Sequence, residues 1–265
     1  MQDAKQIIET AHALADAARA AILPHFRAPG LDAENKLSEG FDPVTVADRA
    51  AERAMRAILA TERPHDTIIG EEFGRKDGTS GLSWVLDPID GTRGFMSGTP
   101  TWGVLIAVSD ASGPIFGMID QPYIGERFWG GLGQSEMTGP QGPRDLKTRA
   151  ARPLSEAVLF TTFPEVGSEA ERLGFQSVEK QVKLTRYGMD CYGYALVATG
   201  QIDLVIEAGL QSYDIQAPIG VVEAAGGVVT DWQGNPVHEG GRVVAAANPQ
   251  IHAEALAYLS QAPEG

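Results

Sequence analysis

The spacing of apolar residues changes after Pro64, and this change constrains the fold more than any other feature of the sequence. Before Pro64, apolar side chains recur at helical spacing, which predicts amphipathic helices over 4–27 and 45–62. We expect Pro29-Gly30 to end the first helix and Pro64 to end the second. After Pro64, short apolar runs separated by glycine-containing turns predict a series of strands, most of them antiparallel.

The predicted elements fall into two groups along the chain. Strands are expected at 67–69, 84–86, 102–108, 114–119, 126–129 and 157–162. Helices and strands then alternate, with helices expected at 168–181, 190–200, 214–225 and from the N-cap Asn248, and strands at 204–206, 228–230 and 243–246. A polar stretch around 35–40 is expected to form a loop or hairpin. This order predicts one catalytic domain with an antiparallel-rich lobe over 1–147 and an α/β lobe over 148–265.

Composition and charge argue against several classes of protein. Lys and Arg number 21 against 35 Asp and Glu, for a net charge of −14, which argues against binding nucleic acid or an anionic membrane by charge. If the substrate is phosphorylated, something other than net charge must hold its phosphate, and a metal ion is the obvious candidate. The single cysteine, Cys191, excludes an intramolecular disulfide. Charged residues among the first twenty argue against a secretory leader, and no apolar run approaches a membrane span, so a cytoplasmic setting is expected.

Carboxylates follow two of the predicted strands. Glu71 comes directly after Ile69-Gly70, Asp87 follows Leu86, and Asp90 lies three residues further on. Active-site groups gather at strand ends in sheet proteins. Two carboxylates on one turn repel each other unless a hard cation lies between them, and oxygen ligands suit Mg²⁺. A solvated turn is the simpler explanation for an Asp-Pro-x-Asp-Gly motif that occurs alone.

Three further acids also have structural explanations. Asp214 lies where a helix is expected to begin, as an N-cap residue would. Asp48 is an acid in the first turn of a predicted helix, where the helix dipole favours it. Asp190 is placed to cap the helix predicted at 190–200. The sequence leaves these alternatives open.

Taken together, the motifs resemble those of the inositol monophosphatase family, whose members are Mg²⁺-dependent, lithium-sensitive phosphatases. The matching segments are Val44-Thr45-Val46-Ala47-Asp48, Gly70-Glu71-Glu72, the run from Trp84 to Thr92, Tyr213-Asp214 and the run from Val222 to Gly227. The resemblance implies a layered αβαβα fold and a homodimer. It also implies two or three Mg²⁺ ions per active site.

The same resemblance implies roles for individual residues. The implied metal ligands are Glu71, Asp87, the backbone carbonyl of Ile89, Asp90 and Asp214. Thr92, with Glu71 and Asp48, is implied to position the attacking water. The phosphate is implied to lie over the backbone N–H groups of Gly91 and Thr92, so that Ile89, Asp90, Gly91, Thr92 and Asp214 also bind substrate.

Within the family, the chain is most similar to the histidinol-phosphate phosphatases. The similarity rests on the runs 90–95, 98–103, 186–192 and 207–210. Asp190 and Glu207, the latter expected at a strand end facing the site, would suit a substrate with a cationic end. L-histidinol phosphate has an ammonium group and an imidazole that protonates near neutral pH. Arg186 is either a further substrate contact or an ionic partner of Asp190.

These observations lead to one main hypothesis and two alternatives. The main hypothesis is Mg²⁺-dependent hydrolysis of L-histidinol phosphate to L-histidinol and phosphate. The first alternative is the same chemistry on another small ester, such as an inositol phosphate or a nucleotide 3′-phosphate. The second is a non-catalytic protein that keeps the fold and acts through a partner such as the transcription machinery.

Overall fold

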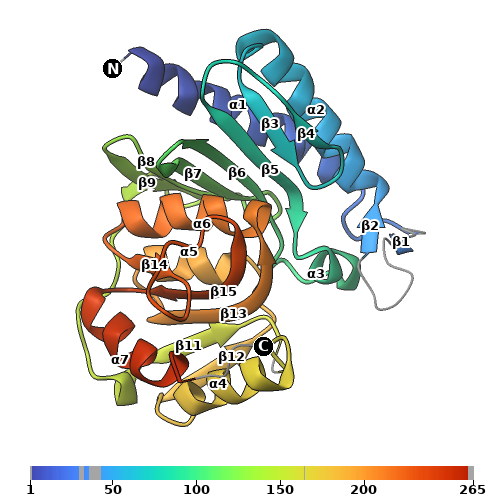
Figure 1. Ribbon diagram of the computed structural model, residues 1–265. Helices are drawn as coiled ribbons and strands as arrows, with labels where there is room; N and C mark the ends of the chain where they lie inside the picture. The colour runs from blue at the N-terminus through green and yellow to red at the C-terminus, as the bar shows by residue number, and fades with distance from the viewer. Residues whose placement is uncertain (1, 30–32, 36–42, 164, 262–265) are drawn as a thin grey trace.

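The computed structural model describes residues 2–29, 33–35, 43–163 and 165–261. Its elements stack in five layers, with helices on both outer faces and between two sheets (Figure 1). Helices α1 (Gln2–Ile22) and α2 (Val46–Glu62) cover the first sheet, and α4 (Glu169–Glu179) and α7 (Pro249–Leu259) cover the second. Helices α5 (Tyr192–Ala198) and α6 (Ser212–Ala224) lie between the sheets. The predicted αβαβα order is confirmed.

The N-terminal helices differ from the expectation at one end. Helix α1 ends at Ile22, five residues earlier than predicted, because Pro24 follows and cannot donate a helical hydrogen bond. The prediction that the helix continues to 27 is therefore wrong. Phe26 stays buried in the turn that follows and packs against Phe95 and Trp102. Helix α2 ends before Pro64, as predicted.

A short hairpin precedes α2. Strands β1 (Ala33–Asn35) and β2 (Pro43–Thr45) pair antiparallel. The segment between them, where a loop or hairpin was predicted around 35–40, lies mostly outside the described residues. Thr45 ends β2 and is the N-cap of α2, so the hairpin leads directly into the helix.

The first sheet has eight strands within the described residues, in the order β10-β9-β8-β7-β6-β5-β3-β4. The bounds are β3 (Thr67–Gly70), β4 (Gly74–Lys76), β5 (Ser83–Asp90), β6 (Gly103–Asp110), β7 (Gly113–Gln121), β8 (Glu126–Gly131), β9 (Gln134–Thr138) and β10 (Arg144–Asp145). All neighbours pair antiparallel except β3 and β5, which are parallel. The predicted antiparallel character is confirmed apart from this one pair.

The second sheet has the order β12-β11-β13-β15-β14 within the described residues. Its strands are β11 (Val158–Thr161), β12 (Leu184–Tyr187), β13 (Leu204–Gln211), β14 (Val228–Thr230) and β15 (Gly240–Ala246), and a short 3₁₀ helix spans Leu154–Glu156. Strand β13 is longer than the predicted 204–206, and α5 is shorter than the predicted 190–200. Asn248 caps α7 and accepts a hydrogen bond from the Ile251 amide, as expected of an N-cap.

Helix α6 ties the two sheets together. A Cβ atom on Gly220 would lie 2.4 Å from the Gly117 nitrogen of β7, so the helix and strand backbones touch. One hydrophobic cluster includes Val85 of the first sheet, Val221 of α6 and Val243 of the second sheet. The division into lobes at 147/148 remains a prediction. None of the helices in the described part of the chain combines the length and apolar character that a membrane span needs.

Candidate active site

Parallel pairing of β3 and β5 places two acids side by side. Gly70 lies opposite Leu86, and the Glu71 amide donates to the Leu86 carbonyl at 3.2 Å. Because both strands run in the same direction, the next residues, Glu71 and Asp87, lie side by side. Glu71 directly follows β3, whereas Asp87 lies inside β5, which continues to Asp90 and does not end at 86 as predicted. Their side chains interact, and this contact contributes to the raised pKa of Asp87.

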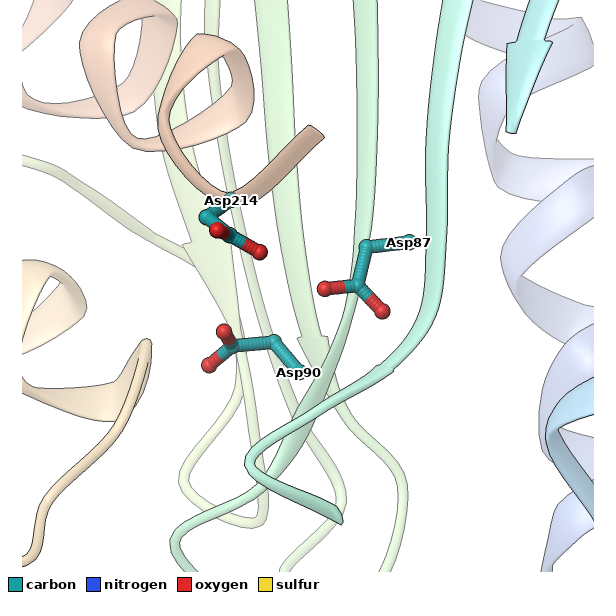
Figure 2. Close-up of side chains that lie close together, drawn as sticks. All are labelled: Asp87, Asp90 and Asp214. Atoms are coloured by element: carbon teal, nitrogen blue, oxygen red, sulfur yellow. The ribbon is translucent and has the colours of Figure 1, made fainter. Parts of the chain in front are cut away.

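Asp87, Asp90 and Asp214 form a carboxylate cluster. One ligand oxygen from each lies within 4.8 Å of the others, and Figure 2 shows the three side chains facing one another. An irregularity in the pairing of β5 between Asp87 and Asp90 lets both acids turn toward the same point. Asp214 comes from the first turn of α6, far away in sequence.

Asp214 also has a structural role, though not as the N-cap that was the alternative explanation. Gln211 is the N-cap of α6, and Asp214 stands three residues later, where its Oδ2 accepts the Gln211 amide at 2.6 Å. This capping-box bond holds the carboxylate at the helix N-terminus, next to the cluster.

The cluster is electrostatically unfavourable without a cation. Burial, together with the charges of Glu71, Asp90 and Asp214, raises the pKa of Asp87 well above its usual range. Burial and the charges of Asp190 and Asp214 do the same for the pKa of Asp90. Three converging carboxylates with only oxygen donors fit a hard divalent cation such as Mg²⁺ better than a soft metal. The structure brings together these three acids, which the resemblance implied as metal ligands; that they bind a metal remains a prediction.

The two other predicted ligands lie at the edge of the cluster. Glu71 and Ile89 line the same cavity as Asp87, Asp90 and Asp214. Glu71 is not among the residues whose oxygens all lie within 4.8 Å of one another. The Ile89 carbonyl accepts a hydrogen bond from the Thr92 hydroxyl at 3.1 Å. Their metal-binding roles therefore remain predictions.

Thr92 begins a short helix, α3 (Thr92–Ser97), after Gly91 in the left-handed conformation (φ 82°). A glycine adopts this φ without strain because it has no Cβ atom. The Thr92 hydroxyl lies 3.5 Å from Oδ1 of Asp48. Asp48 is buried, and its Oδ2 accepts from both the amide and the hydroxyl of Thr45. Asp48 therefore holds the start of α2 and also faces Thr92.

A second cavity, of about 210 Å³, opens from the carboxylate cluster toward β11 and β13. It is lined by Asp90, Thr161, Thr162, Phe163, Val166, Gly167, Asp190, Cys191, Tyr194, Glu207, Ala208, Leu210 and Asp214. Asp90 and Asp214 line this cavity as well as the first, so the two cavities adjoin at the carboxylate cluster. Cys191 is buried there, and burial raises the pKa of its thiol well above the usual range.

Glu207 lines this cavity but not from a strand end, as the sequence predicted. It lies inside β13, which continues to Gln211 after a pairing irregularity between Glu207 and Leu210. Its Oε1 accepts from the Thr162 amide at 3.1 Å and the Thr162 hydroxyl at 2.6 Å, and its Oε2 accepts from the Tyr194 hydroxyl at 2.7 Å. These three donors are neutral. Burial raises the pKa of Glu207, and these hydrogen bonds oppose the shift.

Asp190 is not the N-cap of α5, because Cys191 holds that position. Asp190 has a left-handed backbone (φ 47°), an uncommon conformation for a residue other than glycine. Its Oδ2 accepts from the Thr101 hydroxyl at 2.7 Å. A Cβ atom on Gly91 would lie 2.7 Å from the Asp190 carboxyl carbon, so this carboxylate packs on the start of α3. Asp190 lines both cavities.

Arg186 does not occupy the predicted place. It is exposed on the edge strand β12 and lines neither cavity. Among the described residues no ion pair joins Arg186 to Asp190, and the positive charge that acts on the pKa of Asp190 comes from Arg93. The interpretation of Arg186 as an ionic partner of Asp190 is therefore wrong, and its alternative role as a substrate contact remains a prediction.

Sequence reasoning missed the Arg93–Phe163 pair; Phe163 lines both cavities, and Arg93 lines the one that contains the carboxylate cluster. The Arg93 guanidinium lies over the Phe163 ring, 4.8 Å from its centroid, and Phe163 is 45% exposed. Arg93 directly follows Thr92, so its position could have been inferred. No sequence signal marks Phe163 or Thr162, which follow β11 and reach the site only through the parallel sheet.

Comparisons with known proteins agree with this geometry. A bifunctional phosphatase named IMPL2, chloroplastic, from Arabidopsis thaliana is 42% identical over 260 residues, covering 94% of this chain and 73% of that protein. A histidinol-phosphatase from Streptomyces coelicolor is 37% identical, covering 98% and 99%. An inositol-1-monophosphatase from Caulobacter vibrioides is 31% identical, covering 83% and 88%. The names of these relatives therefore refer to more than one substrate.

A solved structure and a family model give the same result. The structure of an inositol monophosphatase from Zymomonas mobilis superposes with a TM-score of 0.85 at 39% identity, covering 97% of this chain and 98% of that one. The model of the inositol monophosphatase family matches residues 3–264. With its layered fold and its carboxylate cluster, the chain belongs to the inositol monophosphatase family of metal-dependent phosphatases.

Proposed function

We propose that this phosphatase hydrolyses L-histidinol phosphate to L-histidinol and phosphate with the help of Mg²⁺. The observation that carries the proposal is the pair of acids Asp190 and Glu207, which line the cavity adjoining the carboxylate cluster. The charge of Arg93 already acts on Asp190, whereas the hydrogen-bond donors to Glu207, from Thr162 and Tyr194, are all neutral. An ammonium or imidazolium group would give Glu207 a cationic partner that a neutral polyol would not.

The carboxylate cluster would form the part of the site that binds the phosphate group of the substrate. Glu71, Asp87, Asp90, Asp214 and the Ile89 carbonyl would hold two or three Mg²⁺ ions. When bound, these ions supply the positive charge that neutralises the phosphate dianion. The backbone N–H groups of Gly91 and Thr92 would lie against the phosphate oxygens.

Three side chains would orient the attacking water. Thr92 presents a hydroxyl that contacts both Ile89 and Asp48. With its proton directed to one of these acceptors, the hydroxyl oxygen can accept a hydrogen bond from water. Glu71, whose side chain interacts with that of Asp87, would accept a hydrogen bond from the second proton of that water. Phosphoryl transfer mainly needs such positioning and charge stabilisation.

The second cavity would bind the alcohol part of the ester, which is the leaving group. Glu207 is held by three neutral donors, so a cation arriving in the cavity would add a charge-assisted bond that the protein does not supply. Phe163 lines the cavity and is partly exposed, so the ring face that Arg93 does not cover can stack on an imidazole. Asp190 would contact the part of the substrate nearest the phosphate.

We also propose a homodimer that works in the cytoplasm, built from subunits with approximate lobes 1–147 and 148–265. Bacterial histidinol-phosphatases among the relatives support the cytoplasmic setting. Gel filtration with light scattering would give a mass near twice the 28.2 kDa of one chain if the dimer forms.

The deciding experiment measures phosphate release from L-histidinol phosphate and from inositol 1-phosphate, each with and without Mg²⁺. We expect Mg²⁺-dependent turnover with a clear preference for L-histidinol phosphate. A preference for inositol 1-phosphate would favour the inositol monophosphatase activity of the Caulobacter relative. Release from neither ester would overturn the catalytic proposal and favour a partner-binding role.

A further inference from the structure

Glu52 is a fully buried acid on α2 that lies under the turn carrying Glu71. Its exposed fraction is 0%. Its Oε2 accepts the Glu72 amide at 2.7 Å, and its Oε1 accepts the Phe73 amide at 3.3 Å. A Cβ atom on Gly70 would lie 2.0 Å from Oε1, so the carboxylate fills the space directly beneath the turn.

Arg56 completes this contact one helical turn later. Its Nε donates to Oε1 of Glu52 at 2.7 Å, and its Nη2 donates to the Gly74 carbonyl. The pair therefore binds the backbone of the turn between β3 and β4 at three successive residues, 72 to 74. Two neighbouring arginines add side-chain contacts: Arg53 lies over the Phe73 ring at 5.0 Å, and Arg49 lies 4.0 Å from Glu72.

The position of Glu52 on its helix links this turn to the water-orienting group. Asp48 and Glu52 are four residues apart, and both are buried on the same face of α2. Asp48 faces Thr92, whereas Glu52 holds the residues that directly follow Glu71. Helix α2 therefore contacts Thr92 through Asp48 and the turn after Glu71 through Glu52, so it reaches both groups proposed to orient the attacking water.

A buried ion pair is weak evidence for a purely stabilising role, since well-packed apolar residues would serve stability as well. Buried acceptors aimed at the backbone beside a metal ligand are typical of the outer contacts that orient such ligands. We propose that Glu52 and Arg56 are positioning residues that aim Glu71 at the metal centre. This inference rests on the metal-binding role proposed for Glu71.

The test measures Mn²⁺ binding to the metal-free protein by electron paramagnetic resonance, a readout independent of turnover. Glu52→Gln keeps the volume but replaces one acceptor with an NH₂ group, which faces an amide donor or the Arg56 guanidinium. We expect the affinity for Mn²⁺ to fall about 10- to 100-fold, as for other outer contacts of metal ligands. Arg56→Lys, which loses the forked contact with Gly74, should weaken binding in the same direction.

Asp203→Asn is the matched control. Asp203 is also fully buried, and its Oδ2 accepts one backbone amide, from Val158 at 2.9 Å, and one arginine, Arg149 at 2.9 Å. It lies in the second sheet layer, away from the turn after Glu71. We expect this variant to lose thermal stability while its Mn²⁺ affinity stays within about twofold of wild type, since distant sites act independently.

Each outcome bears on the proposal. Unchanged affinity in Glu52→Gln would overturn it, as would an equal loss in Asp203→Asn. If Glu52→Gln does not fold, unchanged affinity in Arg56→Lys overturns it instead. A wild-type chain that bound no Mn²⁺ would overturn the metal centre as well. Failure to hydrolyse L-histidinol phosphate would concern the substrate alone, because the Mn²⁺ measurement contains no ester.

Discussion

The Thr92 hydroxyl lies 3.5 Å from the Asp48 carboxylate, although 44 residues separate them in sequence. Both hydrogen bonds from Thr45 fall on the other carboxylate oxygen of Asp48. Oδ1, the oxygen that faces Thr92, accepts neither of these bonds. Because Oδ2 fixes Asp48 to the start of α2, Oδ1 can orient the Thr92 hydroxyl. A threonine hydroxyl has one proton and two lone pairs, so fixing its proton fixes where it accepts.

Replacing Thr92 by Ala should lower kcat by roughly 10²–10⁴, the range for groups that handle a proton in the transition state. KM should change less, because the lost contact is made mainly in the transition state. Steady-state kinetics with saturating Mg²⁺ would measure both constants. Thr92→Ser is the control and should keep most of the activity, since it retains the hydroxyl. A raised KM with near-normal kcat in Thr92→Ala would instead assign Thr92 to substrate binding.

Glu207→Gln should selectively impair turnover of the cationic substrate. A hydrogen bond to a charged group contributes roughly 1.5–3 kcal/mol, so its loss should lower kcat/KM by about ten- to a hundredfold on L-histidinol phosphate. Inositol 1-phosphate should be affected less, because the cluster holds its phosphate in the same way. Tyr194→Phe is the control: it removes one bond to Glu207 and keeps the negative charge.

Asp190→Ser should also lower kcat/KM on L-histidinol phosphate more than on inositol 1-phosphate, because it removes a carboxylate proposed to contact the cationic ester. The measurement is the ratio of kcat/KM on the two esters for wild type and each variant. Equal losses on both esters would mean that Asp190 and Glu207 support the structure of the site, and the choice of L-histidinol phosphate would lose its main physical argument.

The sequence was informative for Glu71, which directly follows the apolar strand β3 as predicted. Asp87 was expected at a strand end too but lies inside β5, and Asp214 was placed at the site only by the family resemblance, because a helix start alone explains an acid there. Positions that depend on irregular backbone were less predictable. Glu207 was placed at a strand end because Gly209 looked like a terminator, whereas β13 continues past it to Gln211.

Proximity in sequence also misled the prediction for Arg186. Its closeness to Asp190 suggested an ion pair, but the strand β12 ends at Tyr187 and the chain turns before Asp190. Glu52 was missed for the opposite reason. A charged residue in an amphipathic helix usually lies on the solvated face, and its actual partners, the amides of Glu72 and Phe73, are brought to it only by the packing of α2 on the sheet.

Removing the metal should abolish turnover and leave the fold intact. Asp87, Asp90 and Asp214 converge on one point, and burial together with the neighbouring carboxylates raises the pKa values of Asp87 and Asp90, so a bound cation would relieve the repulsion. Dialysis against a chelator followed by a phosphate-release assay, with circular dichroism to follow the fold, tests this. Readdition of Mg²⁺ should restore activity in wild type but not in Asp90→Asn or Asp214→Asn. Full activity after chelation would refute the metal requirement.

The metal-free protein should become less stable as the pH rises. Asp87 and Asp90 have folded-state pKa values above the ordinary 3.8, so the native state binds more protons than the unfolded state at intermediate pH. Their stabilising contribution is therefore complete below that value and is lost as the pH rises through the folded-state pKa values. Urea unfolding between about pH 5 and about pH 8 should show a falling free energy of unfolding in the metal-free protein.

Two comparisons identify the cluster as the source of this fall. Saturating Mg²⁺ should remove the fall in the free energy of unfolding, because the bound ion favours the ionised carboxylates at neutral pH. Asp90→Asn should reduce it without metal, since this change removes one titrating group and also one of the charges that raise the pKa of Asp87. The free energy of unfolding of metal-free Asp90→Asn should therefore exceed that of wild type at the upper end of the pH range. If the metal-free wild type were equally stable throughout that range, the carboxylates would not repel one another as the geometry requires.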